Sequence, residues 1–283
     1  MNDAVTEVPS TTVEPVAATA PRPVIGAMSL TDATPDRMTL HTTEALLLLS
    51  GRSAEPSSSA GAIPGGRRFA AILKTIWHLS GRDHPYADWV LIRMGQGLDA
   101  VRSYVATVTH EHEARLDDLR HKGLSLTVLS ARHPHTVHLG FRSPYGYAMA
   151  EAVLEFDRFV RVVKTLIHKD QLADLEGRSA IRSASRRFRA LFQEPIRWER
   201  SLLDTDLRFL TRTDYLPEAD ESARKRVALA AQLLGALPID VLTGAERPRH
   251  TQQRSVLSVE QQRQLREHHH AAVDDEGTRG GPR

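Results

Sequence analysis

The chain has 283 residues, of which 41% are hydrophobic and 25% charged, and its formal net charge of +2 is typical of a folded globular protein. It contains no cysteine, which excludes disulfides and thiolate metal sites and suits a reducing cytoplasm. No apolar run approaches the roughly 20 residues that span a bilayer, and Met1–Pro23 lacks the pattern of a signal peptide, so we expect a cytoplasmic protein without a membrane partner.

Both ends of the chain lack hydrophobic periodicity. Residues 1–35 are rich in Ala, Thr, Val and Pro, and we predict a disordered N-terminal tail. Residues 250–283 are rich in Gln, Arg and His and are predicted to be mostly disordered, with a short helix at Ser255–Glu267 as one option. Residues 36–249 are predicted to form a helix-dominated α+β domain.

The first elements of this domain differ in how clearly they are predicted. Arg37–Ser50 starts with polar and apolar residues in alternation, which favours a strand, while its run of leucines also fits a buried helix. Arg67–Ser80 has the spacing of an amphipathic helix. Tyr86–His121 keeps apolar residues three and four apart almost throughout, which predicts one long helix. Its stripe favours packing in the core over a dimer seam.

Two short alternating runs follow the long helix. Leu124–Val128 and Val137–Phe141 alternate apolar and polar residues around a polar turn, which predicts a hairpin. Ser143-Pro144 then resembles a helix start, and apolar spacing continues from Tyr145 to His168. A second helix is predicted from Asp170 to about Phe192, stopped by Pro195. Helices at Ser201–Thr213 and Ala219–Gly235 and an extended piece at Leu237–Leu242 complete the prediction.

The second of these helices carries a stripe of arginines on one face, namely Arg178, Arg182, Arg186 and Arg189. The segment Arg158–Arg200 holds eleven Arg and Lys against five Asp and Glu, a net charge of +6 that leaves −4 for the remainder. Few acids are near enough to pair with the stripe, and duplex phosphates would accept bidentate contacts from it. Two alternatives stay open: a solvated helix face enriched in Arg by a GC-rich genome, and an acidic protein partner.

The strand before these helices offers a second DNA contact. Strand, helix and helix follow one another as in ribbon-helix-helix proteins, where two such strands pair across a dimer and enter the major groove. The outward positions Thr136, His138, Gly140 and Arg142 include side chains that can contact base edges: Thr136, His138 and Arg142. Against this interpretation, the run Leu124–Leu129 could already pair with the strand inside one chain.

Metal and catalytic patterns are weak. The histidines His133, His135 and His138 have no thiol or carboxylate close in sequence, and a proline interrupts them, so no metal site is expected. His112 and Arg115 match the His-x-x-Arg element of tyrosine recombinases, but no convincing framework surrounds Tyr215, the remaining candidate nucleophile. Phosphate-binding glycine loops and serine nucleophile elbows are absent. We expect no cofactor and no enzymatic activity.

A group of short runs together carries a family resemblance: Leu40–Thr43, Ser50–Arg52, Arg68–Ala71, Ile76–Trp77, Pro85–Trp89, Phe141–Tyr147 and Leu237–Gly244. These runs resemble the AcaB-like family of conjugative plasmids and integrative conjugative elements. The resemblance spans about Leu40 to Arg249 and leaves the tails outside. It implies a regulator of conjugative-transfer genes with a ribbon-helix-helix-like DNA-binding part and no known catalytic residues.

The function that we predict is a homodimeric DNA-binding transcriptional regulator of a conjugative or integrative element, with double-stranded DNA as partner. The alternative is a non-enzymatic accessory or scaffold protein of the conjugation apparatus, with the helix Tyr86–His121 as its partner surface. A recombinase or nuclease has the least support.

Overall fold

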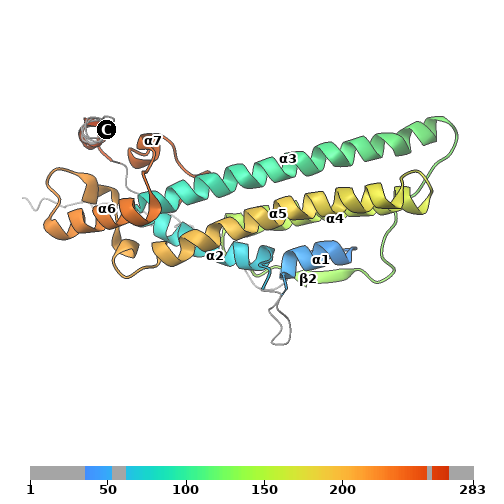
Figure 1. Cartoon of the computed structure of the whole chain (residues 1–283), viewed down its shortest axis with the longest axis horizontal. Helices are drawn as coiled ribbons and strands as arrows, with labels where there is room; N and C mark the ends of the chain where they lie inside the picture. Colours follow the sequence, from blue (N-terminus) through green and yellow to red (C-terminus); the bar gives the residue numbers. More distant parts are fainter. Residues whose placement is uncertain (1–35, 53–61, 254–256, 268–283) are drawn as a thin grey trace, which may run out of the picture. The chain divides into compact units, whose positions relative to one another are not determined.

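The computed structural model describes residues 36–52, 62–253 and 257–267, so the tail predicted at 1–35 and most of the predicted C-terminal tail lie outside the described residues. Its labelled helices are α1 (Thr43–Ser50), α2 (Gly66–Ser80), α3 (Pro85–His121), α4 (Pro144–His168), α5 (Asp174–Leu202), α6 (Glu221–Leu234) and α7 (Ile239–Leu242), and residues 259–267 are also helical. Two strands, β1 (Arg37–Leu40) and β2 (His135–His138), form one small sheet. The prediction of a helix-dominated fold with a small β-ribbon is confirmed (Figure 1).

Helix α4 lies at the centre of the core. It contacts α1, α2, α3, α5 and β1, and its apolar residues repeat on more than one face. Phe156, Phe159 and Val160 are each fully buried. A helix that is apolar on most sides must be enclosed by other elements, which explains why α4 is surrounded. The helix predicted at Tyr145–His168 is therefore confirmed.

The long helix α3 packs along α4 and α5. Its stripe residues Leu91, Met94, Leu98 and Val105 are buried within the chain. The apolar spacing therefore serves the core, as the prediction favoured, and not a seam with a second copy. It also follows that this stripe is not free to act as the partner surface of a scaffold protein.

Helix α5 continues past Pro195, where the sequence predicted a stop. Proline removes one backbone hydrogen bond and disfavours a helix interior by about 3 kcal/mol. Here Pro195 is itself buried, and apolar neighbours before and after it, such as Phe192 and Leu202, are buried as well. Burial of this face outweighs the local cost. The helix also begins at Asp174 and not at Asp170, which has a positive φ of 56°.

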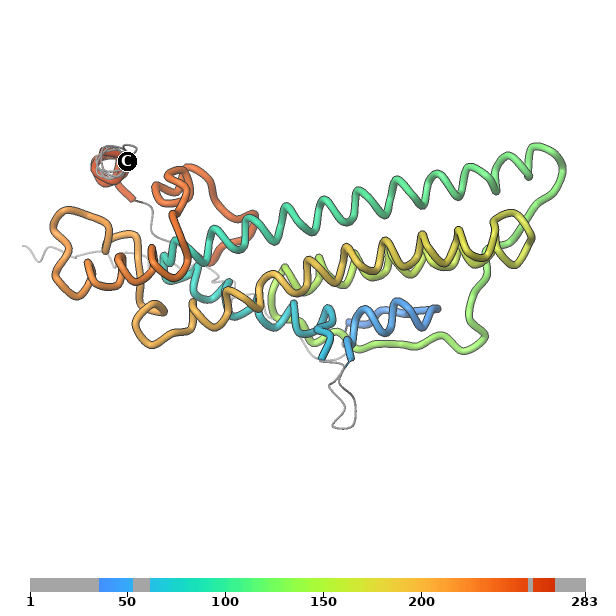
Figure 2. Tube along the Cα trace, in the orientation of Figure 1, coloured from blue at the N-terminus to red at the C-terminus, as the bar shows by residue number. Residues whose placement is uncertain are grey.

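The predicted hairpin is wrong, because β2 pairs with β1 and not with the run Leu124–Val128. The antiparallel register places Met38 opposite Val137 and Thr39 opposite Thr136. The link from α3 to β2 instead runs back past the end of α4 (Figure 2). There the Leu129 N–H donates to Thr165 Oγ1 at 2.9 Å, and Arg161 donates to the Leu129 carbonyl. Alternation predicted two extended segments, but burial of Met38 and Val137 selected the partner.

The ribbon-helix-helix arrangement is not confirmed. The order strand, helix, helix is present as β2, α4 and α5, but β2 pairs with a strand of its own chain. In the dimeric motif the same strand would pair across the two-fold axis.

Other boundaries also differ from the prediction. The region 201–213 contains the end of α5 and two short 3₁₀ turns, Leu207–Phe209 and Arg212–Tyr215, in place of one helix. Leu237–Leu242 contains the short helix α7 and is not an extended piece. Arg37–Ser50 divides into β1 and α1, so each of the two readings of this segment describes one half.

A buried carboxylate connects the ribbon to the core. Asp157 of α4 accepts hydrogen bonds from the backbone N–H groups of His41 and Thr42 and from Thr42 Oγ1, the last at 2.7 Å. Thr42 is also the N-cap of α1. Because these two residues link β1 to α1, Asp157 holds both elements against α4.

No helix within the described ranges is long and apolar enough to cross a bilayer.

Candidate nucleic-acid interface

Three arginines of α5 line a groove against α1. Arg182, Arg186 and Arg189 are spaced by four and three residues, so they share one face of the helix. Glu44 and Leu47 of α1 form the opposite side of this groove, whose volume is about 520 Å³. Arg182 and Arg186 are exposed and Arg189 is half-buried. We call this groove the arginine groove.

The positive charge of the arginine groove is not neutralised by the residues that the structure describes. Glu44 lies 2.8 Å from the ammonium of Lys164 and is engaged there. Arg182, Arg186 and Arg189 form no ion pair within the described part of the chain. Guanidinium groups that gather without carboxylates attract anions, and their planar shape suits phosphate oxygens.

The fourth arginine of the predicted stripe is placed differently. Arg178 is exposed, but it pairs with Asp174 one turn earlier, at 2.9 Å. Arg187, which the stripe did not include, lies over the ring of Tyr104 at 4.1 Å. Arg178 and Arg187 are therefore already engaged, whereas the three arginines at the groove are not.

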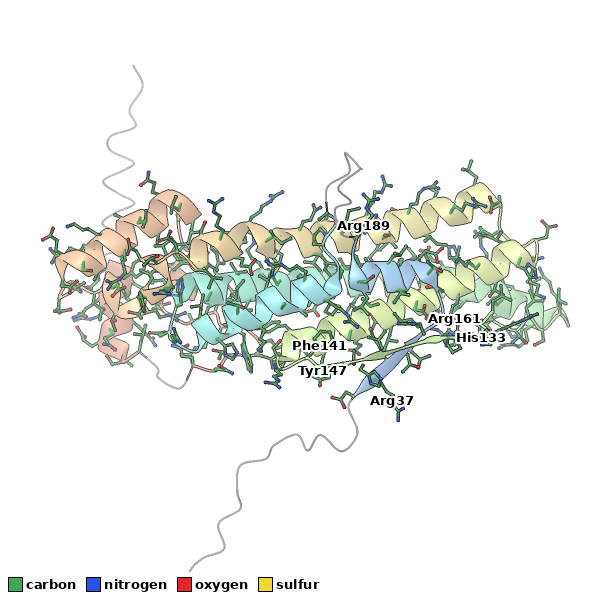
Figure 3. All side chains as sticks on the ribbon, turned by 90° about the horizontal axis from the view of Figure 1, so that it is seen from below. Arg37, His133, Phe141, Tyr147, Arg161 and Arg189 are labelled. Atoms are coloured by element: carbon green, nitrogen blue, oxygen red, sulfur yellow. The ribbon has the colours of Figure 1, made fainter. Side chains whose placement is uncertain are left out.

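The outer face of the β-ribbon is a second polar surface. Thr136 and His138 are exposed, and the register brings Thr39 and Arg37 of β1 beside them. Arg37 points away from the helices in Figure 3. The prediction missed these two β1 residues as site candidates, although the alternation of Arg37 and Thr39 with apolar neighbours was the signal that marks an outward face.

The two surfaces are not directly adjacent. Helix α1 contacts both α5 and α4, and in Figure 3 it lies between α5 and the ribbon. Gly140 and Arg142 are exposed in the segment that leads from β2 to α4. The arginine stripe is exposed at Arg182 and Arg186, but in Figure 3 α1 separates it from the ribbon.

The histidines and the recombinase-like element do not assemble into a site. His135 and His138 are three residues apart on β2 and thus on opposite faces of the strand. Tyr215 lies close enough to Tyr86 to affect the pKa of its phenol, while His112 packs on Phe159. Positions 86 and 112 of one continuous helix lie about 39 Å apart along its axis. His112 and Tyr215 therefore cannot share one scissile phosphate.

A protein-family model that describes transcriptional regulators matches residues 26–254. The match covers most of the chain, so the protein belongs to a family of transcriptional regulators. That family is AcaB, which confirms the resemblance noted from the sequence. A crystal structure of AcaB from uropathogenic E. coli is similar, with a TM-score of 0.44 and 14% identity over 75% of this chain and 95% of that chain. No curated protein matches the chain.

Proposed function

We propose that this transcriptional regulator binds double-stranded DNA, that the arginine groove holds phosphates, and that the outer face of the ribbon contacts base edges. The observation that carries the proposal is the set of three unpaired guanidiniums, Arg182, Arg186 and Arg189, in one groove of the described structure. Phosphate contacts supply affinity and orientation, while base contacts supply specificity. Such a protein needs no catalytic group and acts in the cytoplasm of a bacterium, where its DNA lies.

The residues divide by role. Arg182, Arg186 and Arg189 hold the backbone of the duplex, and Arg178 joins them when DNA displaces its contact with Asp174. Thr136, His138 and Arg142 contact the groove edges, together with Arg37 and Thr39, which the register places beside the first two of these residues. A hydroxyl, an imidazole and a guanidinium are all groups that form hydrogen bonds with base edges.

The test is the salt dependence of duplex binding. Converting Arg182 and Arg186 to Ala removes two phosphate contacts, so the slope of log Kd against log salt concentration should become shallower by about 2. Binding should weaken for all duplex sequences alike. Fluorescence anisotropy at several salt concentrations, with circular dichroism as a folding check, measures both effects.

The matched control is Arg263→Ala. Arg263 is exposed and pairs with Glu260 at 2.7 Å, so its substitution should leave the slope of log Kd against log salt concentration unchanged. A purified protein that ignores duplexes even in dilute buffer would refute the proposal.

We also propose that the regulator is a homodimer and that its target lies near conjugative-transfer genes. A pair of chains would present two ribbons to two half-sites one helical turn apart, as dimeric regulators do. Analytical ultracentrifugation with DNA should give two chains per duplex. Sequencing of genomic fragments captured by the protein should recover a palindromic site, and capture of unrelated fragments only would contradict this part of the proposal.

A further inference from the structure

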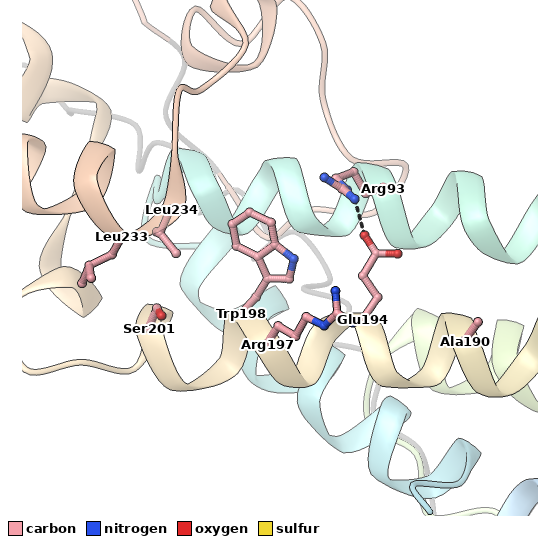
Figure 4. A pocket seen from close by; sticks show the side chains of 8 residues that line it. All are labelled: Arg93, Ala190, Glu194, Arg197, Trp198, Ser201, Leu233 and Leu234. Carbon is pink, nitrogen blue, oxygen red and sulfur yellow. Dashed lines mark hydrogen bonds and ion pairs between the residues drawn. The ribbon is translucent and has the colours of Figure 1, made fainter.

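A second cavity lies between α3, α5 and α6, and none of its lining residues belongs to β1 or β2. Its volume is about 420 Å³, within the range of pockets that bind small molecules. It is lined by Arg93, Ala190, Glu194, Arg197, Trp198, Ser201, Leu233 and Leu234. Figure 4 shows the indole of Trp198 projecting from α5 toward α3, with Leu233 and Leu234 at the other end of the cavity. We call this cavity the Trp198 pocket.

One side of the pocket is aromatic. Trp198 meets Trp89 edge-on with ring centroids 5.2 Å apart, and the guanidinium of Arg93 lies 5.9 Å from the Trp198 ring. Trp198 is therefore held in place by these neighbours, and it lines the cavity. Rings that bind such a surface in offset or edge-on geometry are favoured beyond the area that they bury.

The other side is aliphatic and incompletely covered. Leu233 is 53% exposed although it lines a cavity. Helix α6 is buried through few residues, chiefly Ala223, Ala230 and Leu234. An apolar molecule in the pocket would cover Leu233 and remove its surface from water, a favourable change.

The charge of the pocket is +1. Arg93 and Glu194 neutralise each other at 2.5 Å, as the dashed line in Figure 4 marks. Arg197 lines the same cavity and forms no ion pair within the described residues. An exposed guanidinium beside a hydrophobic wall suits a carboxylate, which it can hold by two parallel hydrogen bonds. The hydroxyl of Ser201 provides one further polar contact.

We propose that the Trp198 pocket binds a small aromatic monocarboxylate, with the ring between Trp198 and Leu233 and the carboxylate on Arg197. The two apolar walls select the ring, the single free charge selects a monoanion, and the volume selects a small molecule. This site goes beyond DNA binding and uses none of the residues that we assign to the duplex.

The experiment titrates the purified full-length protein with phenylacetate. Isothermal titration calorimetry should show saturable binding with a Kd of about 1 mM or tighter, as a fragment of this size allows. The fluorescence of Trp89 and Trp198 should change with the same Kd. Phenylacetamide, which has the same ring without the charge, should bind about tenfold more weakly or worse. Absence of saturable binding, or equal affinity for the two compounds, would overturn the proposal.

Two variants separate the proposed contacts from general effects. Arg197→Gln should weaken phenylacetate binding about tenfold or more, whereas Arg200→Gln, on the same helix but outside the pocket lining, should leave it unchanged. Leu233→Glu places a carboxylate on the exposed wall, which should repel the carboxylate of phenylacetate and abolish binding. The circular dichroism spectrum should stay that of the parent protein. Equal affinities for the two glutamine variants would contradict the role of Arg197.

Discussion

At the scale of single residues, burial decides which groups carry charge. His84, the N-cap of α3, is fully buried: its Nδ1 accepts the Ala87 N–H, and Nε2 lies 3.0 Å from the Leu207 carbonyl. Burial lowers the pKa of His84 to about 4, so the ring is neutral in the folded protein at neutral pH. Its hydrogen bonds fit a neutral tautomer with one donor and one acceptor.

This gives the fold a defined acid sensitivity. The unfolded chain binds a proton at His84 below about pH 6.5, while the folded chain resists it until about pH 4. The free energy of unfolding should therefore fall as the pH falls through this window, by up to roughly 3 kcal/mol from His84 alone. In His84→Asn, which keeps a capping side chain, that loss should be absent. Urea unfolding at pH 7, 5.5 and 4.5 tests this, and a difference between parent and variant that does not change with pH would contradict it.

The arginine stripe also shows how far a residue pattern can predict a site. Offsets of four and three residues correctly placed Arg182, Arg186 and Arg189 on one face, since a helix repeats every 3.6 residues. The pattern did not show which of these arginines have an ion-pair partner. Arg178 has an acid one turn away on its own helix, but the opposite wall of the groove comes from α1, more than a hundred residues earlier in the chain.

At the scale of elements, the two glycines of α3 differ in how closely another helix packs against them. A side chain at Gly95 would meet nothing within 4 Å, whereas a Cβ at Gly97 would lie 2.5 Å from Leu191 Cδ1 of α5. Gly97 therefore allows the close approach of two helices, and Gly95 has no such packing reason. Glycine is disfavoured in a helix interior by about 1 kcal/mol relative to alanine.

We expect Gly95→Ala to stabilise the protein by up to about 1 kcal/mol, through helix propensity alone. Gly97→Ala gains the same propensity but must displace the buried Leu191, and overpacking of this kind costs about 1–3 kcal/mol. In urea denaturation, the free energy of unfolding of Gly95→Ala should exceed that of the parent, and that of Gly97→Ala should be lower than that of Gly95→Ala. Equal stability of the two variants would show that α3 and α5 separate more readily than the packing implies.

At the scale of the whole molecule, one buried arginine joins segments that are distant in sequence. Arg212 is 1% exposed; it lies 2.6 Å from Asp83 and 2.8 Å from Asp88, and it donates to the carbonyls of Val241 and Leu242. The turn before α3, the start of α3 and α7 therefore meet at one guanidinium. Two of the runs that carried the family resemblance, Pro85–Trp89 and Leu237–Gly244, come together here.

Removal of this charge should destabilise the fold. Arg212→Met leaves the fully buried Asp88 without its partner, which costs about 3–5 kcal/mol for a broken buried pair. Combining it with Asp88→Leu should recover part of the loss, because the fully buried carboxylate is then absent and only Asp83, whose side chain is 17% exposed, is left without its partner. Arg208→Met, at an exposed arginine of the neighbouring turn, is the control and should change stability by less than about 0.5 kcal/mol. A small effect of Arg212→Met, comparable with the control, would mean that water replaces the ion pair.

The sequence by itself determined the long helices, the amphipathic faces that form the core, and the family. Hydrophobic periodicity acts within a few residues and survives in any tertiary context, so α2, α3 and α4 were predicted nearly to their ends. The tertiary structure decided the partner of β2, the continuation of α5 through Pro195, and the arginine groove. Each of these depends on burial against a segment far along the chain, and local propensity carries no record of such a distant neighbour.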